Sequence, residues 1–332
     1  MKHTTKTIGS RFAALLLCLC MVFTMVPSAY AAEDEDDLIG ANIQDGVIVG
    51  YYGPGGDIVI PNTITAIGPE AFKGNKKITS VTIPGSVSQI GYSAFEGCPN
   101  LEKILFSNPK NGAQLTIRVS AFIDCPKLTE CTIPATAVYV TANVFKGCTS
   151  MTEIKVDPDN PYYFTQDGVL FGPWVDEGVP QYEDKNLALT AYPCGNPRTS
   201  YLIPETVNGR TVNQVWASGF RKASNLTHIE IPATCVKLGG NAFEETGLTD
   251  ITIPATVTDI GSGLFENCTA LTDVTFQGRV DSIAYSLFLG CTSLQRVNFK
   301  GGVPTTVDTY AFQNCTSLSN LILPEGLLSI KA

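Results

Sequence analysis

The feature that most constrains the fold is a phenylalanine that recurs at a nearly constant interval through most of the chain. The segment from Ile78 to Cys98 (ITSVTIPGSVSQIGYSAFEGC) is repeated around it. Counted from the residue before the proline, apolar residues fall at plus four and plus seven and the phenylalanine at plus twelve. The phenylalanines are Phe72, Phe95, Phe122, Phe145, Phe220, Phe243, Phe265, Phe288 and Phe312, and successive gaps are 23, 27, 23, 75, 23, 22, 23 and 24 residues. Such a period predicts a solenoid of stacked repeats.

One repeat is too small to fold alone. It offers about six large apolar side chains, worth roughly 1.5–3 kcal/mol each when buried, whereas ordering its backbone costs about 1–2 kcal/mol per residue. Stability must therefore come from neighbouring repeats that cover one another. The alternation in Val81-Thr82-Ile83 predicts a short strand, and strands one repeat apart form a parallel sheet. The proline after the strand ends the pairing, and the IG-x-x-AF-x-x-C segment predicts a short helical or 3₁₀ turn.

The repeat resembles the BspA-like leucine-rich repeat of bacterial cell-surface proteins, whose units read roughly L-T-x-I-x-I-P-x-x-V-x-x-I-G-x-x-A-F-x-x-C. The similarity runs from about Asp45 to the C-terminus. It implies a leucine-rich-repeat solenoid over 45–332, with a parallel β-sheet on the concave side and turns and short helical segments on the other. It also implies an exported surface protein, since some members of the family adhere to host matrix proteins or to other cells.

The N-terminus is typical of a protein that leaves the cytoplasm. Residues 1–31 combine a charged start, an apolar stretch over 13–26 and an A-x-A cleavage site at 29–31, which predicts a secretory signal peptide. About 14 apolar residues are too few for a membrane span, which needs about 20, so we expect no membrane insertion. Residues 32–44, with the run EDEDD, are predicted to be an acidic disordered leader.

The acidic balance of the chain limits its partners. The whole chain has a net charge of −9, and residues 1–31 hold three Lys or Arg and no Asp or Glu, so removing them leaves −12. This excess argues against nucleic acid or an anionic membrane as a partner.

Two segments depart from the simple repeat. Residues 45–61 alternate apolar and polar residues around Gly53–Gly56, which predicts a hairpin that caps the N-terminal end of the stack. The 75-residue gap holds an insertion at about 157–200, in which Asp167-Gly168 indicates a β-hairpin. The chain then rejoins the stack at 201–204.

The aromatic residues of the insertion are candidates for ligand binding. If exposed, they would form a binding patch; the alternative is that they pack the hairpin against its neighbours. They are Tyr162, Tyr163, Trp174 and Tyr182.

The outward residues of the strands form the second candidate binding site. In the predicted sheet they make one row on the concave face, the usual binding face of solenoids. They are Thr82, Leu105, Thr132, Lys155, Glu230, Thr252, Thr275, Asn298 and Ile322. Strand propensity alone explains the threonines, so any specificity is expected at Lys155, Glu230 and Asn298.

The cysteines follow the repeat. Of eleven, two lie in the predicted signal peptide, and six stand three residues after a repeat phenylalanine: Cys98, Cys125, Cys148, Cys268, Cys291 and Cys315. Asn75, Ala223 and Thr246 take this place in other units, so the position needs a small buried side chain, which free cysteine provides. Cys131 and Cys235 replace core residues, and only Cys194 is expected to be accessible.

Disulfides are the alternative for an exported protein. However, strands lie about 4.7–4.9 Å apart, slightly wider than the Cβ spacing of about 3.5–4.5 Å in a disulfide, and nine remaining cysteines is an odd number. We therefore predict a ladder of free thiols.

Little in the sequence points to catalysis. His228 is the only histidine outside the predicted signal peptide, so every arrangement of the Ser-His-Asp kind depends on it. A zinc site needs about four nitrogen or sulfur ligands, and no C-x-x-C motif lies beyond that segment. We expect no metal, no cofactor and no enzymatic activity.

Three functions are therefore ranked. The first is a non-catalytic, exported binding or adhesion protein of the bacterial cell surface, whose partner is a host extracellular-matrix protein, another surface protein or a glycan. The second is a structural spacer for a missing C-terminal domain, since a further repeat that begins at Leu318 stops at residue 332. The weakest is a carbohydrate-active enzyme with paired carboxylates.

Overall fold

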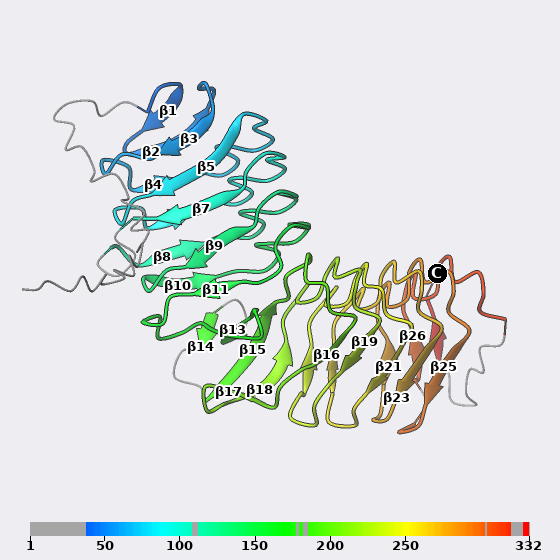
Figure 1. Cartoon of the computed structure of the whole chain (residues 1–332). Helices are drawn as coiled ribbons and strands as arrows, with labels where there is room; N and C mark the ends of the chain where they lie inside the picture. The colour runs from blue at the N-terminus through cyan, green and yellow to red at the C-terminus, as the bar shows by residue number, and fades with distance from the viewer. Residues whose placement is uncertain are drawn as a thin grey trace, which may run out of the picture. The chain divides into compact units, whose positions relative to one another are not determined.

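The chain winds into a parallel β-solenoid of about eleven turns (Figure 1). The computed structural model describes residues 38–107, 112–176, 179–181, 185–302, 304–319 and 328–331. The predicted signal peptide, residues 32–37 of the leader, Tyr182 and Ile322 lie outside these ranges. No helix in the described part of the chain has the length and hydropathy that crossing a membrane requires.

A typical repeat contributes a first strand, which in many repeats precedes a proline, and a second strand after it. The first strands pair in parallel with those of neighbouring repeats. One sheet has the order β11-β9-β7-β5-β3 and consists of β3 (Gly56–Val59), β5 (Ile78–Ile83), β7 (Lys103–Phe106), β9 (Glu130–Ile133) and β11 (Lys155–Val156). After the insertion come β16 (Ser200–Leu202) with β19 (His228–Glu230), and then β21 (Asp250–Ile253), β23 (Asp273–Phe276) and β25 (Arg296–Phe299).

The second strands form their own sheets. The first is β1 (Ala41–Gln44), β2 (Val47–Tyr51), β4 (Ala66–Ile67), β6 (Gln89–Ile90), β8 (Leu115–Ile117) and β10 (Ala137–Val140). The next is β12 (Phe164–Gln166), β13 (Val169–Asp176), β15 (Asn186–Ala191), β18 (Arg210–Val215), β20 (Lys237–Leu238) and β22 (Asp259–Ile260), with β14 (Val179–Gln181) on β13 and β17 (Thr206–Val207) on β18. The last is β24 (Ser282–Ile283), β26 (Thr306–Val307) and β27 (Ser329–Ile330).

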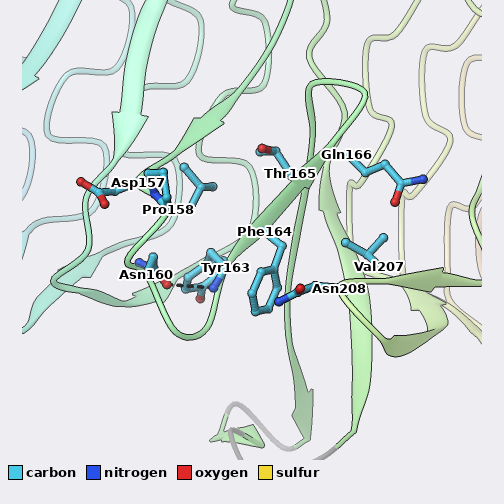
Figure 2. A pocket seen from close by; sticks show the side chains of 10 residues that line it. Asp157, Pro158, Asn160, Tyr163, Phe164, Thr165, Gln166, Val207 and Asn208 are labelled. Atoms are coloured by element: carbon cyan, nitrogen blue, oxygen red, sulfur yellow. Dashed lines mark hydrogen bonds between the residues drawn. The ribbon is translucent and has the colours of Figure 1, made fainter.

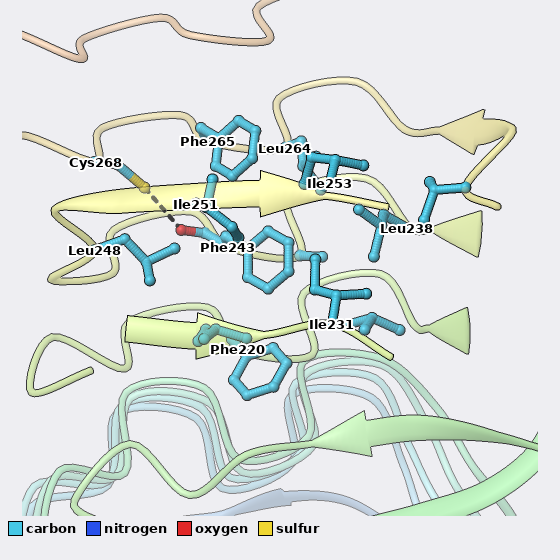
Figure 3. Packing of buried hydrophobic residues seen from close by; sticks show 14 of the residues in the cluster. Phe220, Ile231, Leu238, Phe243, Leu248, Ile251, Ile253, Leu264, Phe265 and Cys268 are labelled. Carbon is cyan, nitrogen blue, oxygen red and sulfur yellow. Dashed lines mark hydrogen bonds between the residues drawn. The ribbon is translucent and has the colours of Figure 1, made fainter. Parts of the chain in front are cut away.

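The repeat phenylalanines stack on one another in the interior, as the period predicts. Phe72, Phe95, Phe122 and Phe145 are stacked with ring centroids 4.8 to 5.7 Å apart. A second stack runs from Phe220 to Phe312 with centroids 5.3 to 5.6 Å apart. Figure 3 shows Phe220, Phe243 and Phe265 one above another, beside the inward isoleucines and leucines of the strands. Equivalent side chains of successive repeats therefore fill the core in register.

The core is divided at the insertion. Its buried residues form two clusters, and β13 contributes to both, with Leu170 in one and Val169 and Phe171 in the other. Since successive residues of a strand point to opposite faces, β13 packs a core on each side. The sequence predicted one continuous stack, and the structure has two stacks separated by this strand.

The turn that carries the phenylalanine is not helical, contrary to the prediction; no helix occurs anywhere in the described residues. In each repeat the residues two before and two after the phenylalanine have positive φ, as in Ser93 (53°) and Gly97 (66°). A left-handed residue every four positions interrupts a right-handed helix.

The hydrogen bonds of the turn alternate accordingly. Glu96 N donates to Ser93 O and Cys98 N to Phe95 O within the turn, whereas Phe95 N and Gly97 N donate to Ala121 O and Ile123 O of the next repeat. Backbone hydrogen bonds therefore join each turn to the turn of the next repeat.

The N-terminal hairpin exists, but at other residues than predicted. Asp45 and Gly46 both have positive φ (50° and 76°) and join β1 to β2 in antiparallel pairing, which is the geometry of a two-residue hairpin turn. β3, placed in the hairpin by the sequence, instead pairs in parallel with β5. Residues 41–44 of the predicted leader are therefore a strand.

Candidate binding surface

The first strands present a row of side chains, which we call the outer row. Its members are in register across neighbouring strands: Val59 opposite Thr82, Thr82 opposite Leu105, Thr132 opposite Lys155, Leu202 opposite Glu230, Thr252 opposite Thr275 and Thr275 opposite Asn298. The row contains the residues expected from the sequence except Ile322, which lies outside the described residues, and it also contains Val59 and Leu202.

The three outer-row residues singled out for specificity are exposed, although two have local partners. Lys155 Nζ lies 3.0 Å from a carboxylate oxygen of Glu153, and Asn298 Nδ2 donates to Thr275 Oγ1 at 3.3 Å. A role for Lys155, Glu230 and Asn298 in binding stays a prediction.

The outer row also exposes apolar side chains. Val59 is 67% exposed, Leu202 60% and Leu105 38%. Val59 and Leu202 were not expected in the row, because one belongs to a strand assigned to the hairpin and the other follows the insertion. Aligning the residue two before each repeat proline would have found Leu202 in the sequence.

The outer row is interrupted between β11 and β16. Each of these strands has a pairing partner on one side only, β9 and β19 respectively. The tip of the β12–β13 hairpin lies at the interruption: Ile154 N donates to Gly168 O at 2.8 Å, and Arg198 Nη1 donates to Asp167 O at 3.0 Å. Asp167 and Gly168, both with positive φ, form the turn of this hairpin, as the sequence predicts.

A hollow of about 460 Å³ opens beside this hairpin (Figure 2). We call it the insertion hollow; its lining residues are Val156, Asp157, Pro158, Asn160, Tyr163, Phe164, Thr165, Gln166, Val207 and Asn208. In Figure 2, Asp157 and Pro158 lie on one side and Thr165, Gln166 and Val207 on the other. A second hollow of about 300 Å³, bounded by Leu202 and Arg198, shares Gln166 with it.

Asn160 supports the insertion hollow and has no spare hydrogen-bonding capacity. It is 4% exposed, its Nδ2 donates to Pro134 O and Ala137 O, and its Oδ1 accepts from the backbone N–H groups of Tyr162 and Tyr163. Both donors and both lone pairs of the amide are used. Asn160 therefore fixes the turn after β11 and is not available to a ligand.

Of the four aromatic residues proposed for a patch on the insertion, the structure describes the side chains of two. Tyr163 is only 2% exposed, and its hydroxyl accepts from Val140 N at 2.7 Å, so Tyr163 does not contribute to an exposed patch. It fills the core beside β10, which is the packing alternative. Tyr162 is half-buried. The side chain of Trp174 and all of Tyr182 lie outside what the structure describes, so their role in binding stays a prediction.

Phe164 is the aromatic residue of the insertion hollow that the sequence analysis missed. The Arg210 guanidinium lies 5.3 Å from the centroid of its ring, a distance typical of a cation–π contact. Arg210 and Val207 flank the Asn208-Gly209 turn of a second hairpin, β17–β18. The Asn-Gly dipeptide is a strong hairpin signal that the sequence offered.

The six repeat cysteines lie one per turn and are free. Each thiol donates to the carbonyl of the phenylalanine in the preceding repeat, at 2.9 to 3.1 Å: Cys98 to Phe72, Cys125 to Phe95, Cys148 to Phe122, Cys268 to Phe243, Cys291 to Phe265 and Cys315 to Phe288. That carbonyl also accepts from a backbone N–H in its own turn, as Phe95 O does from Cys98 N. The thiol therefore uses the second lone pair of a buried oxygen.

Accessibility among the cysteines differs from the prediction. Cys194 is 6% exposed, with its thiol 3.3 Å from Arg221 O, and Cys315 is the partly exposed one. Cys194 is buried because the segment after β15 packs back onto the stack.

We expect the native thiols to react slowly with iodoacetamide at pH 8. Burial raises the pKa of Cys268 and of Cys315 to about 11, so little thiolate, the reactive form, is present. Mass spectrometry should find Cys315 labelled first in the folded protein, and all nine cysteines that follow the predicted signal peptide labelled quickly in urea. Fast labelling of Cys291 in the folded protein would contradict the arrangement of the ladder.

The acid–base groups of the outer strands form a solvated cluster. His228 Nδ1 lies 3.8 Å from Asp250 Oδ1, with side chains 54% and 59% exposed. Together with Glu230 they line a hollow of about 310 Å³. Catalytic carboxylates are usually desolvated or strongly perturbed, and these are open to water. Within the described residues no three His, Cys, Asp or Glu side chains are placed to hold a metal ion.

Comparison with known proteins agrees with the solenoid. A leucine-rich repeat protein from Eubacterium ventriosum is 24% identical, with 87% of this chain and 89% of that chain covered and a TM-score of 0.60. The pneumococcal vaccine antigen PcpA is 20% identical, with 85% and 80% covered and a TM-score of 0.52. No curated protein matches the chain. The family model described as "BspA type leucine rich repeat region" matches in six copies over residues 55–165 and 212–332. The chain therefore belongs to the BspA-type leucine-rich repeat family.

Proposed function

We propose that this protein is an exported, non-catalytic binding protein of the bacterial cell surface, and that it binds a protein or glycan partner through the outer row. The observation that carries the proposal is the exposure of apolar side chains, Val59, Leu105 and Leu202, along a row that is otherwise polar. Apolar side chains exposed among polar ones mark many sites of protein–protein recognition.

The family supports this proposal. Its members are bacterial leucine-rich repeat proteins, and solenoids of this kind use extended arrays of strand side chains for binding. One structural relative, PcpA, is described as a pneumococcal vaccine antigen, which fits a molecule displayed outside the cell. The predicted signal peptide supports export in the same way.

The structural spacer and the enzyme are supported less well. A spacer needs no exposed leucines, since a polar row would be equally stable and more soluble. An enzyme would need acidic or nucleophilic groups held away from water, and the His228–Asp250–Glu230 cluster is exposed.

Substituting both outer-row leucines, Leu105→Glu with Leu202→Glu, is expected to weaken binding to a panel of extracellular-matrix proteins and glycans at least tenfold, about 1.4 kcal/mol. The reason is the loss of apolar contact and the burial of two unpaired charges. The control is Val236→Glu, which places a charge at a 43% exposed apolar position beside β20, a second strand. Surface plasmon resonance gives the affinities, and equal affinity for the double variant and the wild type would remove the outer row from the binding site.

A further inference from the structure

The free edge of β12 faces the insertion hollow. β12 pairs with β13 alone, and Gln166 opposes Val169 across the Asp167-Gly168 turn. In a two-residue hairpin the residues that flank the turn form a hydrogen-bonded pair, and such pairs alternate with pairs whose backbone groups point away from each other. Thr165, opposite Leu170, is of the second kind. Its N–H and C=O are therefore directed out of the sheet edge, and Thr165 lines the hollow.

The opposite wall of the hollow offers a second free edge. β11 pairs with β9, and Asp157 N donates to Ile133 O on that side. Because backbone groups alternate in direction along a strand, Val156 directs its N–H and C=O away from β9. Val156 lines the insertion hollow as well.

The size of the hollow suits a short piece of extended chain. One residue of a paired strand occupies about 3.3 Å along the strand, 4.8 Å across it and 10 Å in depth, or about 160 Å³. The hollow of about 460 Å³ is therefore larger than the space of a single strand residue, and the adjoining edge strand, β12, is three residues long. Unpaired backbone donors and acceptors at a sheet edge bind an added strand through main-chain hydrogen bonds.

Charge selects among peptides. Asp157 is the only charged residue of the ten that line the hollow, and the chain as a whole carries a net charge of −9. A cationic side chain on the added strand would contact Asp157, and apolar side chains would contact Val207 and the part of the Phe164 ring that Arg210 does not cover.

We propose that the insertion hollow binds an extended, cationic segment of a protein partner by β-strand addition to the edge of β12 at Thr165. This proposal rests on the proposed binding function and names its partner chemistry. This site is separate from the outer row, and it would recognise the backbone of the partner as well as its side chains.

The test uses substitutions that separate backbone from side chain. The probe is an acetylated, amidated heptapeptide of alternating valine and lysine, and its affinity is measured by isothermal titration calorimetry with the full chain. Thr165→Pro removes the N–H that points out of the edge, at a position where a proline leaves the bonds to β13 intact. We expect its Kd to rise about tenfold, the upper range for one hydrogen bond. Thr165→Ala keeps the N–H and should bind like the wild type.

Two further measurements keep the test independent of folding. The same peptide with alternate amides N-methylated should bind the wild-type protein at least tenfold more weakly. Asp157→Asn should weaken binding of the unmodified peptide and make that binding less dependent on the salt concentration. Thermal unfolding compares the stability of the Thr165→Pro and Thr165→Ala variants.

Two results would overturn the proposal: no binding of the peptide, or equal affinity for its N-methylated form. If the peptide does not bind but a glycan does, in a manner that depends on Phe164, the hollow is a glycan site instead. The proposed function has its own test in the outer-row leucines. Loss of matrix binding in the Leu105→Glu/Leu202→Glu variant together with failure of the peptide would reject strand addition alone.

Discussion

Phe265→Ala should lower the free energy of unfolding by about 3–5 kcal/mol, the usual cost of removing a buried aromatic ring. Phe265 is fully buried, with ring centroids 5.6 Å from those of Phe243 and Phe288. Because each repeat is stabilised by its two neighbours, a cavity here weakens two interfaces at once. Urea unfolding followed by circular dichroism measures the loss.

The control for Phe265→Ala is Tyr285→Ala in the next repeat. Tyr285 is 47% exposed and meets Tyr310 edge-on at 5.6 Å, so the expected loss is about 1 kcal/mol or less. A loss below about 1 kcal/mol for Phe265→Ala would mean that the aromatic stack does not hold the repeats together.

Removing the Arg221 side chain is expected to lower the free energy of unfolding nearly as much as Phe265→Ala does. Arg221 Nη2 donates to Glu244 Oε1 from the neighbouring turn, and the Glu244 side chain is only 4% exposed. Breaking a buried ion pair by removing one partner costs about 3 kcal/mol, because the other charge is left without compensation. Arg221→Met should show this loss at pH 7, whereas Arg279→Met, from a pair about three-quarters exposed, should change stability by about 0.5 kcal/mol or less.

The pH dependence of this effect has a definite sign. Burial raises the pKa of Glu244 above its ordinary value, although Arg221 opposes the shift. The folded state then binds the proton more readily than the unfolded state. The contribution of Glu244 to stability therefore falls as the pH rises from the pKa of Glu244 in the unfolded state through its higher pKa in the folded state. Without Arg221 the pKa of Glu244 rises further. The difference between Arg221→Met and wild type should therefore shrink as the pH is lowered toward about 4.

A double substitution separates the pair from the packing. Replacing both partners, Arg221→Met with Glu244→Leu, removes the unpaired charge and should recover most of the loss. If the double variant is as unstable as Arg221→Met alone, the loss comes from the packing of the arginine stem.

The sequence predicts most of the architecture because the repeat restricts every level of structure. A phenylalanine every 22 to 27 residues on either side of the insertion predicts that the rings stack, although not that β13 divides the stack in two. The alternation around Thr82 and Thr275 predicts the outer row. The small residue three positions after each repeat phenylalanine predicts the ladder of free cysteines. These inferences hold because each position meets the same neighbours in the next repeat.

The remaining features depend on geometry that residue types do not reveal. Asparagine and glycine favour positive φ, but serine does not, and Ser93 and Asn143 take equivalent positions. The mixed residue types hide the left-handed positions, so the turn was predicted to be helical. Tyr163 is buried because Asn160 turns the chain back under β10, a contact between segments outside the repeat. The insertion hollow arises from two strand edges that are far from obvious in the sequence, since β11 and β12 belong to different sheets.

The hydrogen bonds that join one turn to the next give each stack of turns an electric dipole. At every interface between turns the bonds point the same way: Phe72 N to Ala94 O, Phe95 N to Ala121 O, Phe243 N to Leu264 O and Phe265 N to Leu287 O. In the sheets, by contrast, peptide dipoles alternate and largely cancel. The aligned peptide groups of each column of turns add as they do in an α-helix, but with the positive end toward the C-terminal repeats.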